Sequence, residues 1–324
     1  MGRRWAVRIL AGLLGLSGLA LSASAEDKTF ASCALSPGPV GTVARVLDAE
    51  TLVLDDGSAV RLIGALAPRA RDAGAAAGAW PPETEAIKFL SDLVLGKRVK
   101  LAFGGRRKDR YGRFLAQVFL DDGGKTEWVQ GALLTQGHAR MYGLPDSFAC
   151  AHELLAHEAE ARHQRLGLWT NGVYRAMPAS HPRALLRLRG KYERVIGRVA
   201  SIGRTKSTTY LNFGTDWHSD FTVKIGKKVI AANPDLARTL DGLANRTVVV
   251  RGWIERRNGP LIDVADASQI EILDDGANPD ISAITPSSNT RPASVPGDPS
   301  PDVNARKNLR PAPPQGVEPG AVNL

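Results

Sequence analysis

The stretch LDAETLVLDDGSAVRLIGALAPRAR, residues 47–71, has the pattern of one β-hairpin followed by a proline-containing loop. Residues 51–54 and 59–63 are rich in aliphatic and β-branched side chains, which favour strands. The Asp-Asp-Gly sequence at residues 55–57 separates them and is typical of a hairpin turn. Residues 51–63 are therefore expected to form a β-hairpin.

Charged residues lie at the open end of the hairpin. Asp48 and Glu50 come just before the first strand, and Arg61 lies on the second. Carboxylates opposite an arginine indicate a site for a metal ion and a phosphate group. The loop that should complete such a site carries Leu66 and Arg69 and no carboxylate. The sequence therefore raises the question of what this loop does.

The first half of the chain continues the strand pattern. Strands are expected at residues 40–46, 51–54, 59–63, 99–103 and 114–120, and helices at residues 83–95, 127–136 and 147–165. Three strands, a helix, two strands and then helices is the order of a five-stranded barrel of the oligonucleotide-binding (OB) type. We predict that residues 37–170 form this barrel together with three helices.

The second half repeats the barrel order. Strands are expected at residues 195–202, 208–213, 221–225, 247–256 and 261–264, and a helix at residues 234–243. We predict a second five-stranded OB-type barrel over residues 190–273, joined to the first by a linker at residues 177–189. The fold class is then mainly β with α, in two barrels.

Both ends of the chain differ from these domains. Residues 1–25 combine three arginines, an apolar run and an Ala-Ser-Ala site, which predicts a signal peptide cleaved after Ala25 and a periplasmic or secreted protein. No stretch of the mature chain is expected to span a membrane. Residues 276–324 hold ten of the 20 prolines and no aromatic residue, so we expect this tail to be disordered.

The net charge favours anionic partners. The formal charge is +9, and removing the three arginines of the signal peptide leaves +6. The tail from residue 276 has equal numbers of acids and bases, so the excess belongs to the folded part. A basic exported domain prefers nucleic acid or the anionic cell envelope, although solubility alone could also explain this charge.

The mature chain contains two cysteines, Cys33 and Cys150. Two cysteines allow one pairing, and an oxidising compartment permits a disulfide. We therefore expect a Cys33–Cys150 disulfide. A zinc site would need more ligands, and His152 and His157 are five residues apart, which points their rings to different faces of a helix.

Several short motifs follow one another over about 130 residues. They are Asp48-Ala-Glu50-Thr51, Val60-Arg61-Leu-Ile-Gly64, Ala67-Pro68, Asp109-Arg-Tyr-Gly-Arg113, Gln136-Gly137 and Gly167-Leu-Trp169. In this order and spacing they resemble the staphylococcal nuclease (thermonuclease) family. The second domain resembles the OB-type extension of some exported relatives, through residues 210–222 and 251–260.

The resemblance implies a calcium site formed by two carboxylates, a glutamate base after the loop proline, and two phosphate-binding arginines. Arg61 and Arg113 match the arginines, and Glu50, with Asp48 beside it, matches the first calcium carboxylate. Leu66 replaces the second carboxylate, and Arg69 replaces the base. The resemblance therefore implies a degenerate loop. Calcium is a possible cofactor, and we expect this loop to bind it weakly.

Further residues are candidates for contact with nucleic acid. Arg69 would add a third guanidinium to the phosphate site, and Tyr111 either stacks on a base or fills its own turn. In the second domain the candidates are Arg204, Lys206, Trp217 and Arg256, with Trp217 the aromatic residue most expected to be exposed. Successive side chains of a strand point to opposite faces, so we expect about half of the other aromatic residues of this domain to face the core.

Three functions remain open on the sequence. The first is an exported protein that binds nucleic acid or another polyanion on a nuclease scaffold, with lost or much reduced calcium-dependent cleavage. The second is an active nuclease that uses Glu50, Arg61 and Arg113 with a substitute acid such as Asp72. The third is an envelope protein that binds protein or peptidoglycan. Calcium dependence separates the first two, and salt dependence separates the first from the third.

Overall fold

The structure is a computed structural model that describes residues 33–122 and 125–273. The expected signal peptide (1–25) and tail (276–324) lie outside the described residues. Within residues 33–122 and 125–273, no helix is long and apolar enough to cross a lipid bilayer. The fold is mainly β-sheet with helices, as the sequence predicts.

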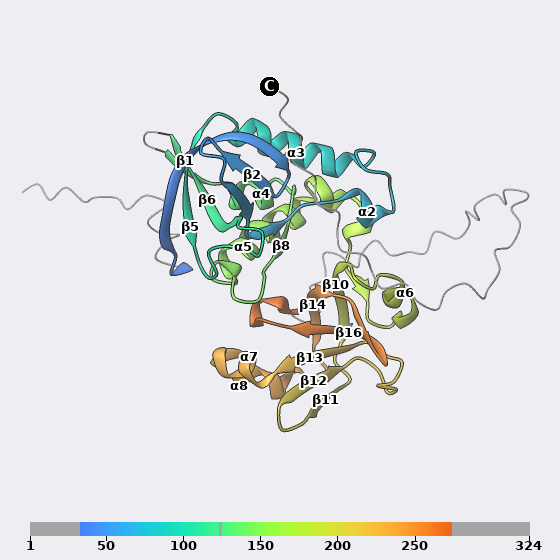
Figure 1. Ribbon diagram of the computed structural model, residues 1–324. Coiled ribbons are helices and arrows are strands. Elements are labelled where there is room, and N and C mark those ends of the chain that lie inside the picture. Colours follow the sequence, from blue (N-terminus) through green and yellow to red (C-terminus); the bar gives the residue numbers. More distant parts are fainter. Residues whose placement is uncertain (1–32, 123–124, 274–324) are drawn as a thin grey trace, which may run out of the picture. The chain divides into compact units, whose positions relative to one another are not determined.

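The first part of the chain forms a closed barrel (Figure 1). Its strands are β1 (Ser36–Asp48), β2 (Thr51–Leu54), β3 (Ala59–Leu62), β5 (Arg98–Phe103) and β6 (Phe114–Asp122). They pair in the order β3-β2-β1-β5-β6, and a parallel ladder between β3 and β6 closes the ring. β7 (Lys125–Trp128) adds to the far edge of β6. This order is the one expected for an OB-type barrel.

The hairpin of residues 51–62 has the register that the sequence pattern requires. Thr51 lies opposite Arg61, and Val53 lies opposite Ala59. Gly57 adopts a φ of +82°, a left-handed turn conformation that a glycine reaches without strain. This register places Arg61 beside the turn that joins β1 to β2, which is where the candidate site forms.

Helices and a small second sheet surround the barrel. The helices are α2 (Ala70–Ala73), α3 (Pro81–Val94), α4 (Val129–Thr135) and α5 (Ala151–Gln164), followed by the 3₁₀ turns η1 (Gly167–Thr170) and η2 (Gly172–Tyr174). α3 buries Ala86, Leu90 and Val94, which are four residues apart and share one face. A two-stranded sheet of β4 (Gly64–Leu66) and β8 (Arg140–Tyr142) was not expected from the sequence.

One hydrophobic core fills the first barrel and extends under its helices. Cys33 and Cys150 lie in this core, both about 1% exposed, and are joined by a disulfide with a Cα–Cα distance of 4.7 Å. The disulfide connects the segment before β1 to the residue that precedes α5, which are 117 residues apart in the chain.

The second part of the chain forms two sheets. β9 (Met177–Pro178), β10 (Tyr192–Arg198), β14 (Thr247–Trp253) and β17 (Ile270–Leu273) make one, in the order β17-β14-β10-β9. β11 (Ser201–Arg204), β12 (Thr208–Asn212), β13 (Thr222–Gly226), β15 (Glu255–Arg257) and β16 (Gly259–Val264) make the other. They share one hydrophobic core, but no ladder within residues 177–273 joins them. The expected second closed barrel is therefore not confirmed.

Short elements in this second part differ from the expectation. The segment expected to be a linker forms β9 and α6 (Pro182–Arg187), and the expected helix at residues 234–243 is divided into α8 (Pro234–Thr239) and the 3₁₀ turn η3 (Leu240–Leu243). α7 (Lys227–Ala232) and the 3₁₀ turn η4 (Ala267–Gln269) complete the elements. β9 pairs in parallel with β10, and such a two-residue strand leaves no detectable pattern in a sequence.

Candidate nucleic-acid site

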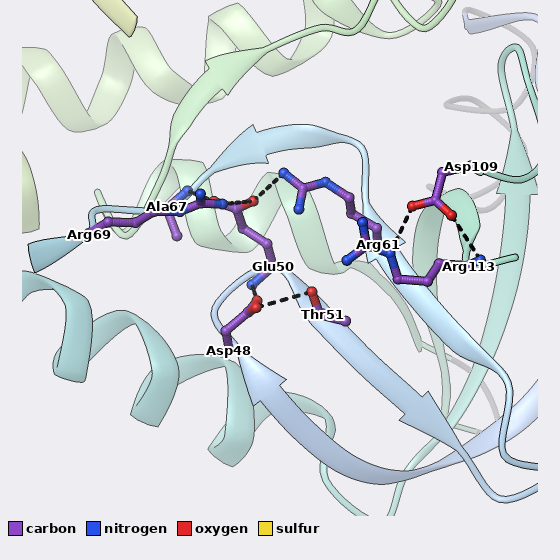
Figure 2. A network of polar contacts seen from close by, with 8 residues as sticks. All are labelled: Asp48, Glu50, Thr51, Arg61, Ala67, Arg69, Asp109 and Arg113. Atoms are coloured by element: carbon purple, nitrogen blue, oxygen red, sulfur yellow. Dashed lines mark hydrogen bonds and ion pairs between the residues drawn. The ribbon is translucent and has the colours of Figure 1, made fainter. Parts of the chain in front are cut away.

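Asp48 shapes the turn between β1 and β2. Its Oδ1 accepts a hydrogen bond from the backbone N–H of Glu50 at 2.7 Å, and its Oδ2 accepts one from Thr51 Oγ1 at 3.3 Å (Figure 2). An aspartate that bonds to the backbone two residues later is a common way to stabilise a tight turn. The proposed metal ligand Asp48 thus holds Glu50 in place through the backbone.

Glu50 is the centre of the site, and both of its carboxylate oxygens accept hydrogen bonds. The side chain is 2% exposed. Oε2 accepts hydrogen bonds from Arg61 Nη2 at 2.6 Å and from Arg69 Nη2 at 2.7 Å, while Oε1 accepts one from the backbone N–H of Ala67 at 3.0 Å. Two guanidinium groups therefore balance one buried carboxylate.

The electrostatic environment of Arg69 follows from this contact. Burial acts to lower the pKa of Arg69, but the charge and the hydrogen bond of Glu50 outweigh it, so the pKa of Arg69 is raised. A guanidinium is protonated at any physiological pH even without this effect. Arg69 therefore remains a permanent cation bound to Glu50.

The residues at this position do not fit a calcium site. Calcium takes six to eight oxygen ligands, several of them carboxylates. Leu66 is 5% exposed on β4 and offers no oxygen from its side chain, and Glu50 already accepts three hydrogen bonds. Across residues 33–122 and 125–273, no group of three histidine, cysteine or acidic residues is placed to hold a metal.

Arg61 lies on β3, Arg113 lies in the turn just before the neighbouring strand β6, and the two are near each other in Figure 2. Arg113 Nε donates to Asp109 Oδ2 at 2.8 Å, and Asp109 also accepts the backbone N–H groups of Tyr111 and Arg113. Burial opposes ionisation of Asp109, but these hydrogen bonds outweigh it and lower its pKa. Asp109 thus fixes the turn that carries Arg113.

Tyr111 lies on the same turn and does not fill it. The residue is 62% exposed. Its hydroxyl accepts a hydrogen bond from Arg110 Nη2 at 2.6 Å, and the guanidiniums of Arg110 and Arg113 lie 4.8 and 5.5 Å from its ring centre. An exposed aromatic ring beside two arginines is a suitable surface for stacking on a base.

Asp72, the expected substitute acid, is already engaged. Its Oδ2 accepts hydrogen bonds from the backbone N–H of Arg69 at 3.1 Å and from the hydroxyl of Tyr174 at 3.2 Å, and it lies 3.5 Å from Arg140 Nη2. The bond from the N–H of Arg69, the N-cap residue of α2, is part of a capping box at the start of that helix.

The structure brings only some of the second-domain candidates together. Arg204 and Trp217 line one hollow of about 440 Å³, together with Tyr210 and Arg257. Trp217 is 57% exposed, as expected, and Arg204 pairs with Asp241. Lys206 and Arg256 are exposed but do not line this hollow. Of the other aromatic residues, Phe221 lies in the core, with Phe213 packed against it.

Sequence reasoning missed four residues next to Arg69. Arg71, Arg140, Lys191 and Tyr192 line a hollow together with Arg69 and with Trp253, one of the second-domain aromatic residues that the sequence offered for stacking. Arg140 lies opposite Leu66 in the β4–β8 pair, and Lys191 precedes β10. These residues come from separate elements, so no spacing in the sequence could have grouped them.

Comparison with known proteins agrees with the fold of the first part of the chain. Residues 59–171 match the family described as "Staphylococcal nuclease homologue". A protein of Escherichia coli O157:H7 named "Uncharacterized endonuclease" is 34% identical over 134 residues, which cover 40% of this chain and 77% of that protein.

Two further relatives match stretches of similar length. "Micrococcal nuclease" of Shigella flexneri is 33% identical over 142 residues, 40% of this chain and 74% of its own length. "Thermonuclease" of Staphylococcus intermedius is 31% identical over 130 residues, 39% of this chain and 74% of its own length. By sequence similarity and by its closed barrel, the chain belongs to the staphylococcal nuclease family.

Proposed function

We propose that this chain binds nucleic acid or another polyanion and that its calcium-dependent phosphodiesterase activity is lost or much reduced. The observation that carries the proposal is the pairing of Glu50 with Arg61 and Arg69, at 2.6 and 2.7 Å on one carboxylate oxygen. A guanidinium there provides the positive charge that calcium would provide, and it cannot coordinate a water molecule for attack.

Phosphodiester hydrolysis needs parts that this arrangement does not offer. Loss of a general base typically reduces a rate by a factor of about 10²–10⁴. Loss of the metal removes several kcal/mol of stabilisation of the transition-state charge. Arg69 stands where the base is expected, and Leu66 where a ligand is expected, so both losses apply together.

Binding of a phosphate chain is supported by the same residues. Arg61, Arg69 and Arg113 supply three guanidinium groups against the two carboxylates of Glu50 and Asp109. Each guanidinium has five N–H donors, so donors remain after these contacts. With the exposed Tyr111 on the adjoining turn, the surface combines charge with a stacking ring.

Export to the periplasm or the medium is part of the proposal. The arginine-led apolar segment at residues 1–25 supports it, and so does the Cys33–Cys150 pair, because disulfides persist in oxidising compartments.

The deciding experiment measures cleavage and binding with purified mature chain. DNA and RNA are incubated with calcium or with chelator, and single-strand affinity is measured over a range of salt concentrations. We expect no chelator-sensitive cleavage, and a logarithm of affinity that falls linearly with the logarithm of salt. Arg113→Ala should weaken binding for all sequences and reduce the salt slope by about one.

Arg238→Ala is the matched control, because Arg238 is an exposed arginine on α8, away from the barrel site. Rapid calcium-dependent cleavage by the unmodified chain would favour the active-nuclease alternative, which the names of the relatives support. Absent or salt-independent binding would favour the envelope-protein alternative.

A further inference from the structure

A hollow of about 390 Å³ lies next to the guanidinium of Arg69. Its volume is within the range of small-molecule sites, about 300–1,000 Å³. The first domain contributes Arg69, Arg71 and Arg140 to its lining, and the segment leading into β10 contributes Lys191 and Tyr192. The hollow is thus made by residues that are more than 100 positions apart in the chain.

The charge of this lining selects an anion. Four cations, Arg69, Arg71, Arg140 and Lys191, face the hollow with a single carboxylate, that of Asp72. The wall also includes Leu66, where the family resemblance implies a carboxylate. The departures at residues 66 and 69 therefore both make the hollow more favourable for a phosphate group.

Three of the four cations are held in position before any ligand binds. Arg140 is 4% exposed, and its Nη1 donates to the backbone oxygen of Tyr192 at 2.7 Å. Lys191 Nζ donates to the backbone oxygen of Asp72 at 2.7 Å, and Arg69 is bound to Glu50. Side chains that are already ordered lose less entropy on binding a ligand.

One cation of the lining is free to meet a ligand. Arg71 is exposed, and its side chain makes no ion pair or hydrogen bond within residues 33–122 and 125–273. A phosphate in the hollow would give Arg71 an acceptor. Arg140 also lines the hollow, and its buried Nε has no hydrogen-bond partner among the residues that the structure describes.

An aromatic wall completes the hollow. Trp253 lines it and is 38% exposed. Its ring is held edge-on by Tyr142 and Tyr192, with ring centres 6.1 and 5.7 Å away. A fixed, partly exposed indole beside a cationic pocket is suited to stacking on a nucleobase.

We infer that this hollow binds one nucleoside phosphate unit, with the phosphate on Arg71, Arg140 and Lys191 and the base on Trp253. The unit is either a free nucleotide or the terminal residue of a single strand. The inference rests on the proposed binding of nucleic acid and adds to it a site to which the second domain contributes.

The test uses the mature chain and thymidine 5′-monophosphate, with tryptophan fluorescence and calorimetry as readouts. We expect saturable binding with quenched fluorescence. Trp253→Leu should remove most of the quenching and weaken binding about tenfold, within the range of about 5- to 150-fold that stacking on one base typically contributes. Arg71→Gln should weaken binding several-fold. Arg238→Gln is the matched control and should change neither quantity.

Trp253→Leu could disturb the fold, because Trp253 packs on two tyrosines. Arg71→Gln should fold normally, because Arg71 is exposed and its side chain has no described partner. Unchanged nucleotide affinity in Arg71→Gln and Trp253→Leu would overturn the inference. So would equal affinity for inorganic phosphate and for the nucleotide, since the base would then contribute nothing.

Two arms separate this inference from the proposed function. If long single strands bind and Arg113→Ala weakens them, but the nucleotide does not bind, the hollow is refuted while the proposed function stands. If neither binds, both fail. Oligothymidylate with a terminal phosphate that binds tighter than the unphosphorylated strand identifies the strand end as the ligand, and equal affinity of the two identifies the free nucleotide.

Discussion

The guanidinium of Arg69 reaches the same oxygen of Glu50 as the guanidinium of Arg61 does. Sequence alone places a cation at residue 69 and a leucine at residue 66, and the family resemblance identifies the positions as altered. The contact itself depends on the path of the loop from β4 to α2, which brings Arg69 back over Glu50. That path was not predictable, because β4 pairs with β8, some 75 residues further along the chain.

Repair of these two positions tests their effect on the chemistry. We expect the double variant Leu66→Asp with Arg69→Glu to gain calcium-dependent cleavage of DNA. One change restores an oxygen ligand near Glu50, and the other replaces a cation with a proton acceptor. Each change alone should do little, so the double variant should gain more than the product of the single gains.

Calorimetric titration with calcium accompanies the repair series. The unmodified chain should show no site tighter than about millimolar, the weak end of protein calcium sites. Glu50→Asp belongs in the series, because the extra methylene of Glu50 changes the reach of the carboxylate. Wild-type cleavage that the double variant does not improve would show that residues 66 and 69 are not what limits the reaction.

Glu193 is a buried acid beside the same hollow. Burial is the main cause that raises its pKa from 4.5 to about 7; Asp72 adds to the rise, and Arg140 and Lys191 oppose it. Between about pH 4.5 and 7 the folded state holds a proton that the unfolded state has released. The free energy of unfolding should therefore fall as pH rises through this window.

Glu193→Gln should remove that decline. A shift of this size corresponds to roughly 3 kcal/mol at most, so the variant should gain up to that amount at pH 8 relative to the wild type and little at pH 4. Urea unfolding at both pH values measures the effect, and Glu255→Gln, an exposed acid, is the control. An equal loss of stability between pH 4 and 8 in wild type and Glu193→Gln would contradict the assignment.

At the level of the elements, the first barrel was the most predictable part. The hairpin strands 51–54 and 59–62 were located within one residue, because alternation, β-branched side chains and the Asp-Asp-Gly turn agree. Helix α3 was expected from its apolar spacing and begins two residues earlier, at Pro81. The short pairs β4–β8 and β9–β10 were missed, because two- and three-residue strands have no period to detect.

Two glycines of the family motifs have a clear structural reason. Gly137 follows α4, Gly167 begins η1, and the N–H of Leu168 donates to the oxygen of Gly137 at 2.9 Å. A Cβ on Gly137 would lie 2.3 Å from the backbone oxygen of Leu166, and Gly137 has a φ of +69°. The backbones after α4 and α5 approach each other only because both positions lack a side chain.

Gly137→Ala should therefore destabilise the fold more than its φ angle alone explains. Gly74 is the matched control, because it has the same φ of +69° and open space around the position of a Cβ. We expect Gly74→Ala to lower the free energy of unfolding by about 1–2 kcal/mol and Gly137→Ala to lower it by a further 1–3 kcal/mol, as forced backbone shifts do. Equal losses in urea unfolding would mean that the contact relaxes freely.

For the molecule as a whole, the sequence predicted two folded regions but not how they are connected. The candidate site around Glu50 follows from motifs that lie close together in the chain, so its residues could be named in advance. The hollow with Lys191 and Trp253 could not, because it depends on contacts between the first and second regions. Those contacts include a fully buried ion pair that no local pattern marks.

Glu158 on α5 and Arg251 on β14 form this pair, with exposed fractions of 0% and 1% and a distance of 2.9 Å. Burial opposes the charged form of Glu158, but the nearby charges of Arg251, Arg162 and Arg194 outweigh it and lower its pKa. Its contribution to stability is therefore present above the ordinary pKa of a glutamate and is lost as pH falls through the lowered value.

Glu158→Gln should lower the free energy of unfolding by about 3–5 kcal/mol at pH 7, because it leaves the buried Arg251 with only the more distant carboxylate of Glu271, at 3.8 Å. The double variant Glu158→Leu with Arg251→Met should recover much of that loss, since it removes both charges and keeps the volume. Urea unfolding followed by circular dichroism and by tryptophan fluorescence measures each variant. We expect one coincident transition in the wild type, because the pair joins the two regions into one cooperative unit. Two separate transitions would show that the pair does not couple the regions. So would losses in Glu158→Leu and in Arg251→Met that simply add in the double variant.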